Sequence, residues 1–177
     1  MTLFPFFQDI EEKKFLIVGG GRVAREKFEK LSQFTRNITV IAPETDIPGA
    51  IIKKFEDTDL DKADVVIGAS SDKALNRHIS RLCQEWGIPV NIVDDPSLCT
   101  FIFPSLIKRG DLVIGISTTG KSPAFSQEMR RRIEEIVPQN TEEALDTLHQ
   151  MREKLKQQVP DQKERARLLK AALEELI

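Results

Sequence analysis

The sequence predicts an α/β fold in which a doubly wound parallel sheet is followed by a small connecting region and a helical C-terminal tail. In the N-terminal half, short apolar runs rich in Val and Ile alternate with amphipathic segments of helical period. A run of glycines separates the first apolar run from the first helical segment. Beyond residue 140, only helical patterns follow.

The first apolar run, residues 15–18, ends in a glycine turn. Gly19, Gly21 and Ala24 fit the spacing G-x-G-x-x-G/A, and a helix is predicted over residues 22–34. Gly19 permits a sharp turn, Gly21 leaves room beside the backbone for a pyrophosphate, and Ala24 allows close helix packing. The free N–H groups and the dipole at the helix start favour phosphate charge. The turn therefore predicts a Rossmann-like dinucleotide site.

A second strand is predicted over residues 37–42, and it ends at Pro43 and Glu44. Glu44 lies 23 residues after Gly21, which is about where a Rossmann unit places an acid that accepts a hydrogen bond from a ribose hydroxyl. No arginine follows Glu44 before Pro48, so NAD is favoured over NADP. The alternative is that Glu44 is an ordinary solvated loop acid.

Further strands are predicted at residues 64–69 and 89–93, and a short strand is predicted to begin at residues 51–52 and to run into residues 53–55. A helix capped by Ser71 or Asp72 is predicted to run to Trp86. The carboxyl ends of parallel strands meet at one edge of a sheet, where ligands bind. The glycine turn and Glu44 are therefore expected to share a crevice with Ala69 and Ser70, which are candidate cofactor contacts, and with Asp94.

The second half of the chain predicts a hairpin and three helices. Strands are expected at residues 101–107 and 112–117, and Ser122 with Pro123 marks the start of a helix. Its apolar side is expected to face inward and comprises Phe125, Met129, Ile133 and Ile136. Two amphipathic helices follow at about residues 141–158 and 162–176. Their N-cap pairs are Asn140 with Glu143 and Asp161 with Glu164. The apolar stripes of these two helices need a partner surface, in this chain or in a second copy.

Residues 115–122 also match the P-loop pattern G-x-x-x-x-G-K-[ST]. A P-loop nucleotide hydrolase is therefore an alternative function. Two features count against it. Gly115 is embedded in an apolar run instead of beginning the turn, and Pro123 lacks an N–H where a phosphate cradle needs donors.

Composition excludes several classes of function. The net charge of −2 gives no general attraction to nucleic acid or anionic membranes. Cys83 and Cys99 have no C-x-x-C spacing, which favours a reducing, cytoplasmic location over a disulfide framework. No signal or transmembrane pattern is recognised. The two histidines show no metal-ligand spacing, so no metal site is predicted, and only Asp94 is kept as a candidate ligand.

Six motifs occur in the order found in one known family, and together they cover about residues 3–137. They are Phe4-Pro5, the glycine turn of residues 16–24, Ala42-Pro43-Glu44, Asn91-Ile92-Val93-Asp94-Asp95-Pro96, Phe101-Ile102-Phe103-Pro104-Ser105 and residues 117–123. With these motifs the chain resembles the precorrin-2 dehydrogenase family, the dehydrogenase and often ferrochelatase component of siroheme synthases.

The resemblance implies that the chain oxidises precorrin-2 to sirohydrochlorin with NAD+, with Fe2+ insertion as a second activity in some members. It implies a homodimer built from a Rossmann NAD-binding domain (residues 1–108), a dimerisation region (109–139) and a helical C-terminal region (140–177). By position, the NAD contacts would be Arg22, Val23, Pro43 and Glu44. Thr119 stands where many members have glycine, so the loop departs from the family pattern at this position. The short tail matches the family weakly, so chelation is left open.

The resemblance also gives Asp94 a role as the catalytic acid/base, which is also important for chelation in the family. Loss of a ring proton from the substrate needs such a base, whereas the alternative is that Asp94 only forms a turn before Pro96. The substrate carries many carboxylates, so Lys121 is the candidate cationic contact. Asn91, Ser117 and Thr118 are candidate polar contacts, and Thr118 lies where some relatives carry a phosphorylated serine. A third alternative is a binding module that senses NAD without turnover.

Overall fold

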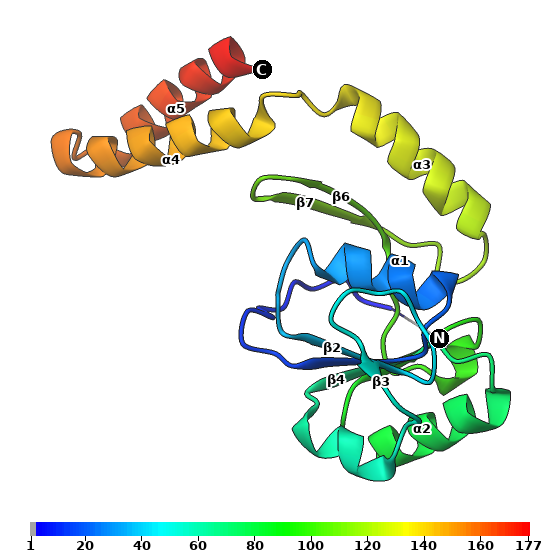
Figure 1. Cartoon of the computed structure of the whole chain (residues 1–177). Helices are drawn as coiled ribbons and strands as arrows, with labels where there is room; N and C mark the ends of the chain where they lie inside the picture. The colour runs from blue at the N-terminus through cyan, green and yellow to red at the C-terminus, as the bar shows by residue number, and fades with distance from the viewer. Residues whose placement is uncertain (1–2) are drawn as a thin grey trace. The chain divides into compact units, whose positions relative to one another are not determined.

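The computed structural model describes residues 3–177 and divides them into two compact units (Figure 1). One unit comprises Leu3–Phe103 and the other comprises residues 104–177. No helix within residues 3–177 is long and apolar enough to cross a membrane.

The N-terminal unit is built on a five-stranded parallel sheet of order β3-β2-β1-β4-β5, which confirms the predicted fold class. The strands are β1 (Phe15–Val18), β2 (Ile38–Ala42), β3 (Ile51–Ile52), β4 (Val65–Gly68) and β5 (Val90–Ile92). The expected continuation of β3 into residues 53–55 is wrong, because the chain bends after Ile52. In the register of the sheet, Val18 pairs with Ile41 on one side and with Gly68 on the other, and Gly68 pairs with Ile92. The carboxyl ends of four strands are therefore level.

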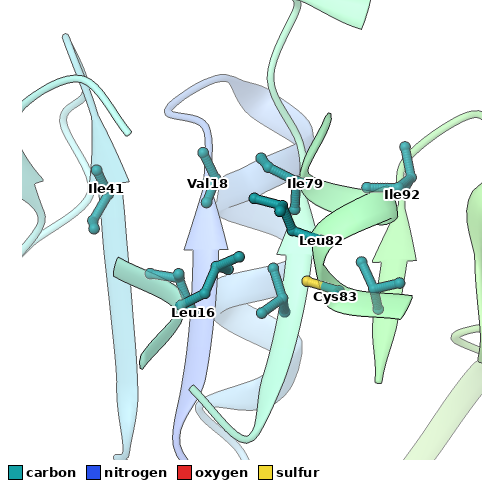
Figure 2. Packing of buried hydrophobic residues seen from close by; sticks show 10 residues of the cluster. Leu16, Val18, Ile41, Ile79, Leu82, Cys83 and Ile92 are labelled. Carbon is teal, nitrogen blue, oxygen red and sulfur yellow. The ribbon is translucent and has the colours of Figure 1, made fainter. Parts of the chain in front are cut away.

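Two helices cover the two faces of this sheet: α1 (Arg22–Leu31) lies on one side and α2 (Lys73–Glu85) on the other (Figure 1). Side chains alternate along β1, so Leu16 and Val18 pack in one cluster and Phe15 and Ile17 in the other. The first cluster joins the sheet to α2 through Ile79, Leu82 and Cys83 (Figure 2). Burial on both faces explains why β1 is entirely apolar.

The helix ends follow local chemistry. Of the two residues considered for the α2 cap, Asp72 caps the helix, and its carboxylate accepts hydrogen bonds from the N–H groups of Ala74 at 2.8 Å and Leu75 at 3.1 Å. Gly87, with a φ of +71°, follows the C-cap of α2. Helix α1 ends at Leu31, three residues earlier than predicted, because the chain after Leu31 turns toward β2.

Two short 3-10 segments were not predicted: η1 (Asp57–Lys62) and η2 (Pro96–Leu98). In η1 a reciprocal pair of hydrogen bonds joins Glu56 and Asp59, which form a capping box, and Leu60 enters the core beside α2. In η2 the Asp95 side chain accepts from the Ser97 N–H at 3.2 Å. Segments this short carry too little periodicity to be recognised from sequence.

Asn76 on α2 holds the loop that follows β4. Its buried amide accepts from the Ser70 N–H at 3.3 Å and donates to the Ser70 carbonyl at 2.9 Å. Asn76→Ala leaves both backbone groups without these partners, so the free energy of unfolding should fall by about 1–3 kcal/mol. Urea denaturation measures it. The exposed Arg77→Ala on the same helix is the control, and equal stabilities for the two variants would contradict this role.

The C-terminal unit begins with an antiparallel hairpin of β6 (Ser105–Arg109) and β7 (Leu112–Ile116). Three helices follow: α3 (Pro123–Ile136), α4 (Thr141–Gln158) and α5 (Gln162–Leu176). The guanidinium of Arg109 donates to the carbonyl oxygens of Val137 and, at 3.0 Å, Glu134. These bonds tie the C-terminal end of α3 to the hairpin. Helices α4 and α5 pack against each other (Figure 1). The apolar stripes of these two helices therefore have part of the partner surface that they need within this chain.

The expected strand over residues 101–107 is wrong for residues 101–104. Beside β5, hydrogen bonds of side chains replace part of the backbone hydrogen bonding that a further strand would make. The Val90 N–H donates to the Thr100 hydroxyl at 2.8 Å, and the Asn91 amide donates to the Phe101 carbonyl at 3.0 Å. These bonds leave the segment irregular until β6 begins at Ser105.

Two further expectations for the C-terminal unit are wrong. Phe125 and Ile136 are 59% and 78% exposed instead of inward, because the hairpin against which α3 packs is only two strands wide. Asn140 makes no side-chain cap of α4, since its amide donates to the Leu176 carbonyl at 2.7 Å. The other cap is confirmed: the Asp161 carboxylate accepts from the Glu164 N–H at 2.7 Å.

The segment before β1 is exposed. The side chains of Phe4, Phe6 and Phe7 are between 75% and 84% exposed. Met1 and Thr2 lie outside the described residues.

Candidate functional site

The level strand ends bring four loops of the N-terminal unit to one edge of the sheet. These loops follow β1, β2, β4 and β5, and they carry the glycine turn, Glu44, Ser70 and Asp94 respectively. The N-terminal unit therefore gathers the candidate cofactor residues and Asp94 as predicted for a doubly wound sheet.

The three glycines of the turn differ in what surrounds them. A Cβ atom on Gly19, whose φ is +134°, would lie 2.3 Å from the Ala69 carbonyl oxygen, and a Cβ on Gly20 would lie 2.3 Å from the Glu44 carbonyl oxygen. A Cβ on Gly21 would meet nothing within 4 Å. The fold itself thus requires Gly19 and Gly20, whereas Gly21 keeps open space beside the backbone.

The start of α1 has the features of an anion site. Gly21 is its N-cap and offers no side-chain hydrogen bond, and the first turn carries no acidic residue. Arg22 is paired with Glu26 one turn later. The buried Ala24 lets the helix approach the sheet closely. The N–H groups at this helix start are thus available to hold a pyrophosphate, in agreement with the open space at Gly21.

Glu44 follows β2 and is exposed, as is Pro43. The Glu44 carboxylate has no hydrogen-bond or ion-pair partner among residues 3–177. Its neighbour Thr45 donates from its hydroxyl to the Gly20 carbonyl at 3.0 Å, which fixes the loop beside the glycine turn. The Glu44 side chain is therefore free to accept from a ribose hydroxyl next to the turn.

Asp94 has a left-handed backbone, with a φ of +62°, and its side chain is exposed. This region is unfavourable for most side chains, although aspartate tolerates it, and such residues cluster at functional sites. The neighbouring Asp95 has a different role, because its carboxylate caps η2. The two consecutive acids therefore have different environments: the Asp95 carboxylate caps a short helix, whereas the Asp94 side chain is exposed to solvent.

Cys99 and Asn91 lie close to Asp94 but are engaged in the structure. The Cys99 thiol accepts from the Ile92 N–H at 3.1 Å and donates to the Ile92 carbonyl at 3.2 Å. Burial raises the pKa of this thiol. The Asn91 amide is buried and bonded to the Phe101 carbonyl. A role of Asn91 in substrate binding stays a prediction.

Lys27 belongs to this region but was not predicted from the sequence. Its Nζ lies 4.3 Å from the centroid of the Phe103 ring, and the side chain is half-buried. Burial lowers the pKa of Lys27. The nearby groups that partly counteract this lowering include Cys99 and Asp94. A signal was present: Lys27 lies three residues after Ala24 and four before Leu31, both of which are buried. Helical spacing thus places Lys27 at the border of the buried face.

The loop of residues 117–122 belongs to the C-terminal unit. Three of its N–H groups donate within the loop: Thr119 N–H to the Ser117 hydroxyl, Lys121 N–H to the Thr118 carbonyl and Ser122 N–H to the Thr118 hydroxyl, at 3.0 to 3.1 Å. A P-loop needs such groups free for phosphate and follows a strand of a parallel sheet, whereas β7 belongs to an antiparallel hairpin. The geometry therefore disfavours a nucleotide hydrolase. Ser117, Thr118 and Lys121 stay predictions as substrate contacts.

Other charged groups behave as surface residues. Arg130, Arg131 and Arg132 form ion pairs with glutamates three or four residues away on α3.

The described residues contain no group of three or more His, Cys, Asp or Glu side chains that would hold a metal ion. A cavity of about 340 Å³ lies near the amino ends of β1 and β2, where Lys14 and Asn37 line it, and so it is apart from the loops described above.

Comparisons with known proteins agree with this geometry. Residues 6–105 match the family model described as "Putative NAD(P)-binding", and residues 109–136 match the model described as "Sirohaem biosynthesis protein central". A siroheme synthase from Thioalkalivibrio sulfidiphilus is 38% identical over 98% of this chain, and one from Psychrobacter sp. (strain PRwf-1) is 36% identical over 90%. The chain spans 38% and 35% of the length of these relatives.

A solved structure described as "SirC, precorrin-2 dehydrogenase" superposes with a TM-score of 0.76 at 21% sequence identity and covers 96% of this chain and 88% of its own. This likeness supports the fold. The two family models account for nearly all of the N-terminal unit and for β7 with α3. The predicted resemblance is confirmed: the chain belongs to the siroheme synthase N-terminal family, with an NAD(P)-binding domain followed by the sirohaem biosynthesis central region.

Proposed function

We propose that this chain oxidises precorrin-2 to sirohydrochlorin with NAD+ as the hydride acceptor. The observation that carries the proposal is the level edge of the sheet, where the open turn at Gly21, the unpaired Glu44 and the left-handed Asp94 all follow strand ends. The family membership and the name of the similar solved structure support the choice of reaction.

The residues of the N-terminal unit fit NAD. The turn at Gly21 and the N–H groups of Arg22 and Val23 would hold the pyrophosphate, and Glu44 would accept from the adenosine ribose. A 2′-phosphate would meet the negative charge of Glu44, so NAD is preferred over NADP. Ala69 and Ser70, against the turn, would complete the cofactor contacts. The nicotinamide, when bound, supplies the acceptor for two electrons and one hydrogen of the substrate.

Asp94 would take the second hydrogen, as a proton, from the macrocycle. Its exposed carboxylate has no hydrogen-bond or ion-pair partner among residues 3–177, and it is therefore free to contact a substrate. Lys121, Ser117, Thr118 and Asn91 are the proposed polar contacts of the substrate. A homodimer is also part of the proposal, because the exposed Phe125 and Ile136 on α3 offer apolar surface that a second copy would cover.

The test is to incubate the chain with NAD+ and precorrin-2 and to follow NADH and sirohydrochlorin by absorbance. We expect both to appear in equal amounts, because one hydride is transferred per substrate. If the folded protein binds NAD+ but forms no NADH, the dehydrogenase proposal is overturned. The result would then favour the alternative of a module that senses NAD without turnover. Magnesium-dependent ATP binding would instead support the hydrolase. Ferrochelatase activity is measured separately, by adding Fe2+ to sirohydrochlorin.

A further inference from the structure

The half-buried Lys27 has no ion-pair partner among the described residues, unlike Arg22 and Arg25 on the same helix. Arg22 is paired with Glu26, and Arg25 is paired with Asp46. Lys27 makes no ion pair within 4.0 Å among the described residues, although its side chain is half-buried. Removing a charge from water without a partner is unfavourable, and a bound anion offsets that cost.

The ring of Phe103 holds this ammonium in place. The Lys27 Nζ lies 4.3 Å from the ring centroid, which is within the range of a cation–π contact. Phe103 itself packs against the core cluster that includes Ala24, Leu31 and Phe15, and its ring is tilted against that of Phe101 with centroids 5.4 Å apart. The aromatic support thus fixes the ammonium on a rigid surface, as a binding residue requires.

Lys27 also lies near Asp94. Burial lowers the pKa of Lys27, and the charge of Asp94, which is beyond ion-pair distance, is one of the weaker causes that act in the opposite direction. Lys27 and Asp94 therefore carry opposite charges that interact without forming an ion pair. A ligand that offers a carboxylate to the cation and a weakly acidic C–H or N–H to the anion would satisfy both.

We propose that Lys27 binds a carboxylate of the substrate and so places the macrocycle beside Asp94. This inference rests on the proposed function, because the tetrapyrrole is the polycarboxylate concerned. A lysine suits this position, since its ammonium bonds a carboxylate as a compact charge while its stem packs on the Phe103 ring.

The test compares Lys27→Gln with the wild-type protein. We expect the KM for precorrin-2 to rise about tenfold or more, as one charge-assisted hydrogen bond is lost, and kcat to stay within about twofold. The Kd for uroporphyrin, a carboxylated porphyrin used as a probe, should rise by a similar factor. The Kd for NAD+ should not change. Lys27→Arg keeps the charge and should restore most of the affinity.

Lys30→Gln is the matched control, because it removes the same charge from an exposed position one turn along the same helix. A Lys27→Gln variant that behaves like Lys30→Gln would overturn the inference, and so would a change in the Kd for NAD+ alone, which would place Lys27 in the cofactor site. If the wild type forms no NADH but binds uroporphyrin in a Lys27-dependent way, the proposed reaction fails and the carboxylate site stands.

Discussion

Asp94→Asn is expected to lower kcat for NADH formation by about 10²- to 10⁴-fold, the usual contribution of a general base. Asparagine has nearly the same size as aspartate and also tolerates the left-handed backbone at this position, where φ is +62°. The fold and the Kd for NAD+ should therefore be unchanged. Steady-state kinetics with precorrin-2, together with a thermal unfolding curve, measure the two effects separately.

Asp95→Asn is the control for this prediction. It removes a carboxylate one residue away, but that carboxylate bonds the Ser97 N–H and, at 2.5 Å, the Ser97 hydroxyl. We expect a small loss of stability and nearly normal turnover. Equal activities for the two variants would remove Asp94 from the mechanism. A larger loss of turnover in Asp95→Asn than in Asp94→Asn would identify Asp95, and not Asp94, as the general base.

Gly19→Ala and Gly21→Ala are expected to have opposite effects on folding and on cofactor binding. At Gly19 the new methyl group would collide with the Ala69 carbonyl, and the φ of +134° is unfavourable for alanine. Unfolding free energy should fall by more than about 3 kcal/mol, enough to unfold a marginally stable unit. At Gly21 the methyl group meets open space, and the φ is −81°, so the protein should fold normally.

The effect of Gly21→Ala should appear in binding instead. The methyl group would occupy the space proposed for the pyrophosphate, and the Kd for NAD+ should rise at least tenfold, or about 1.4 kcal/mol. Calorimetric titration gives the Kd, and circular dichroism shows that the variant is folded. A Gly21→Ala protein that binds NAD+ as tightly as the wild type would place the cofactor elsewhere.

Much of the N-terminal unit was predictable because most of its strands, although not β3, are largely buried. Such strands appear in the sequence as short, fully apolar runs, as in residues 15–18, whose four side chains are all buried. The segment around residues 101–103 is equally apolar, yet it is not a strand. There, the Thr100 hydroxyl and the Asn91 amide form hydrogen bonds that a ladder would otherwise make. A pattern of hydrophobicity does not reveal such side-chain competition.

The candidate site was predictable to the extent that it lies at strand ends. Gly21, Glu44 and Asp94 each follow an apolar run, so a parallel sheet brings their loops to the same edge without further information. Lys27 differs because its environment comes from Phe103, far along the chain. Gly20 was missed for a similar reason, since the atoms that exclude a side chain there belong to Glu44, Thr45 and Ala42.

The order of strands in the sheet also affects the newly synthesised chain. β1 is made first but lies in the centre, between β2 and β4, and β4 is made only after β3 and η1. Until β4 (Val65–Gly68) has left the ribosome, β1 has an unpaired edge, and its apolar face stays uncovered until α2 (Lys73–Glu85) has followed. Parallel pairing across such long separations is slow, and unpaired strand edges promote aggregation. A pause in translation before β4 has emerged would therefore prolong this exposure, whereas a pause after Phe103 has left the ribosome would find the N-terminal unit complete.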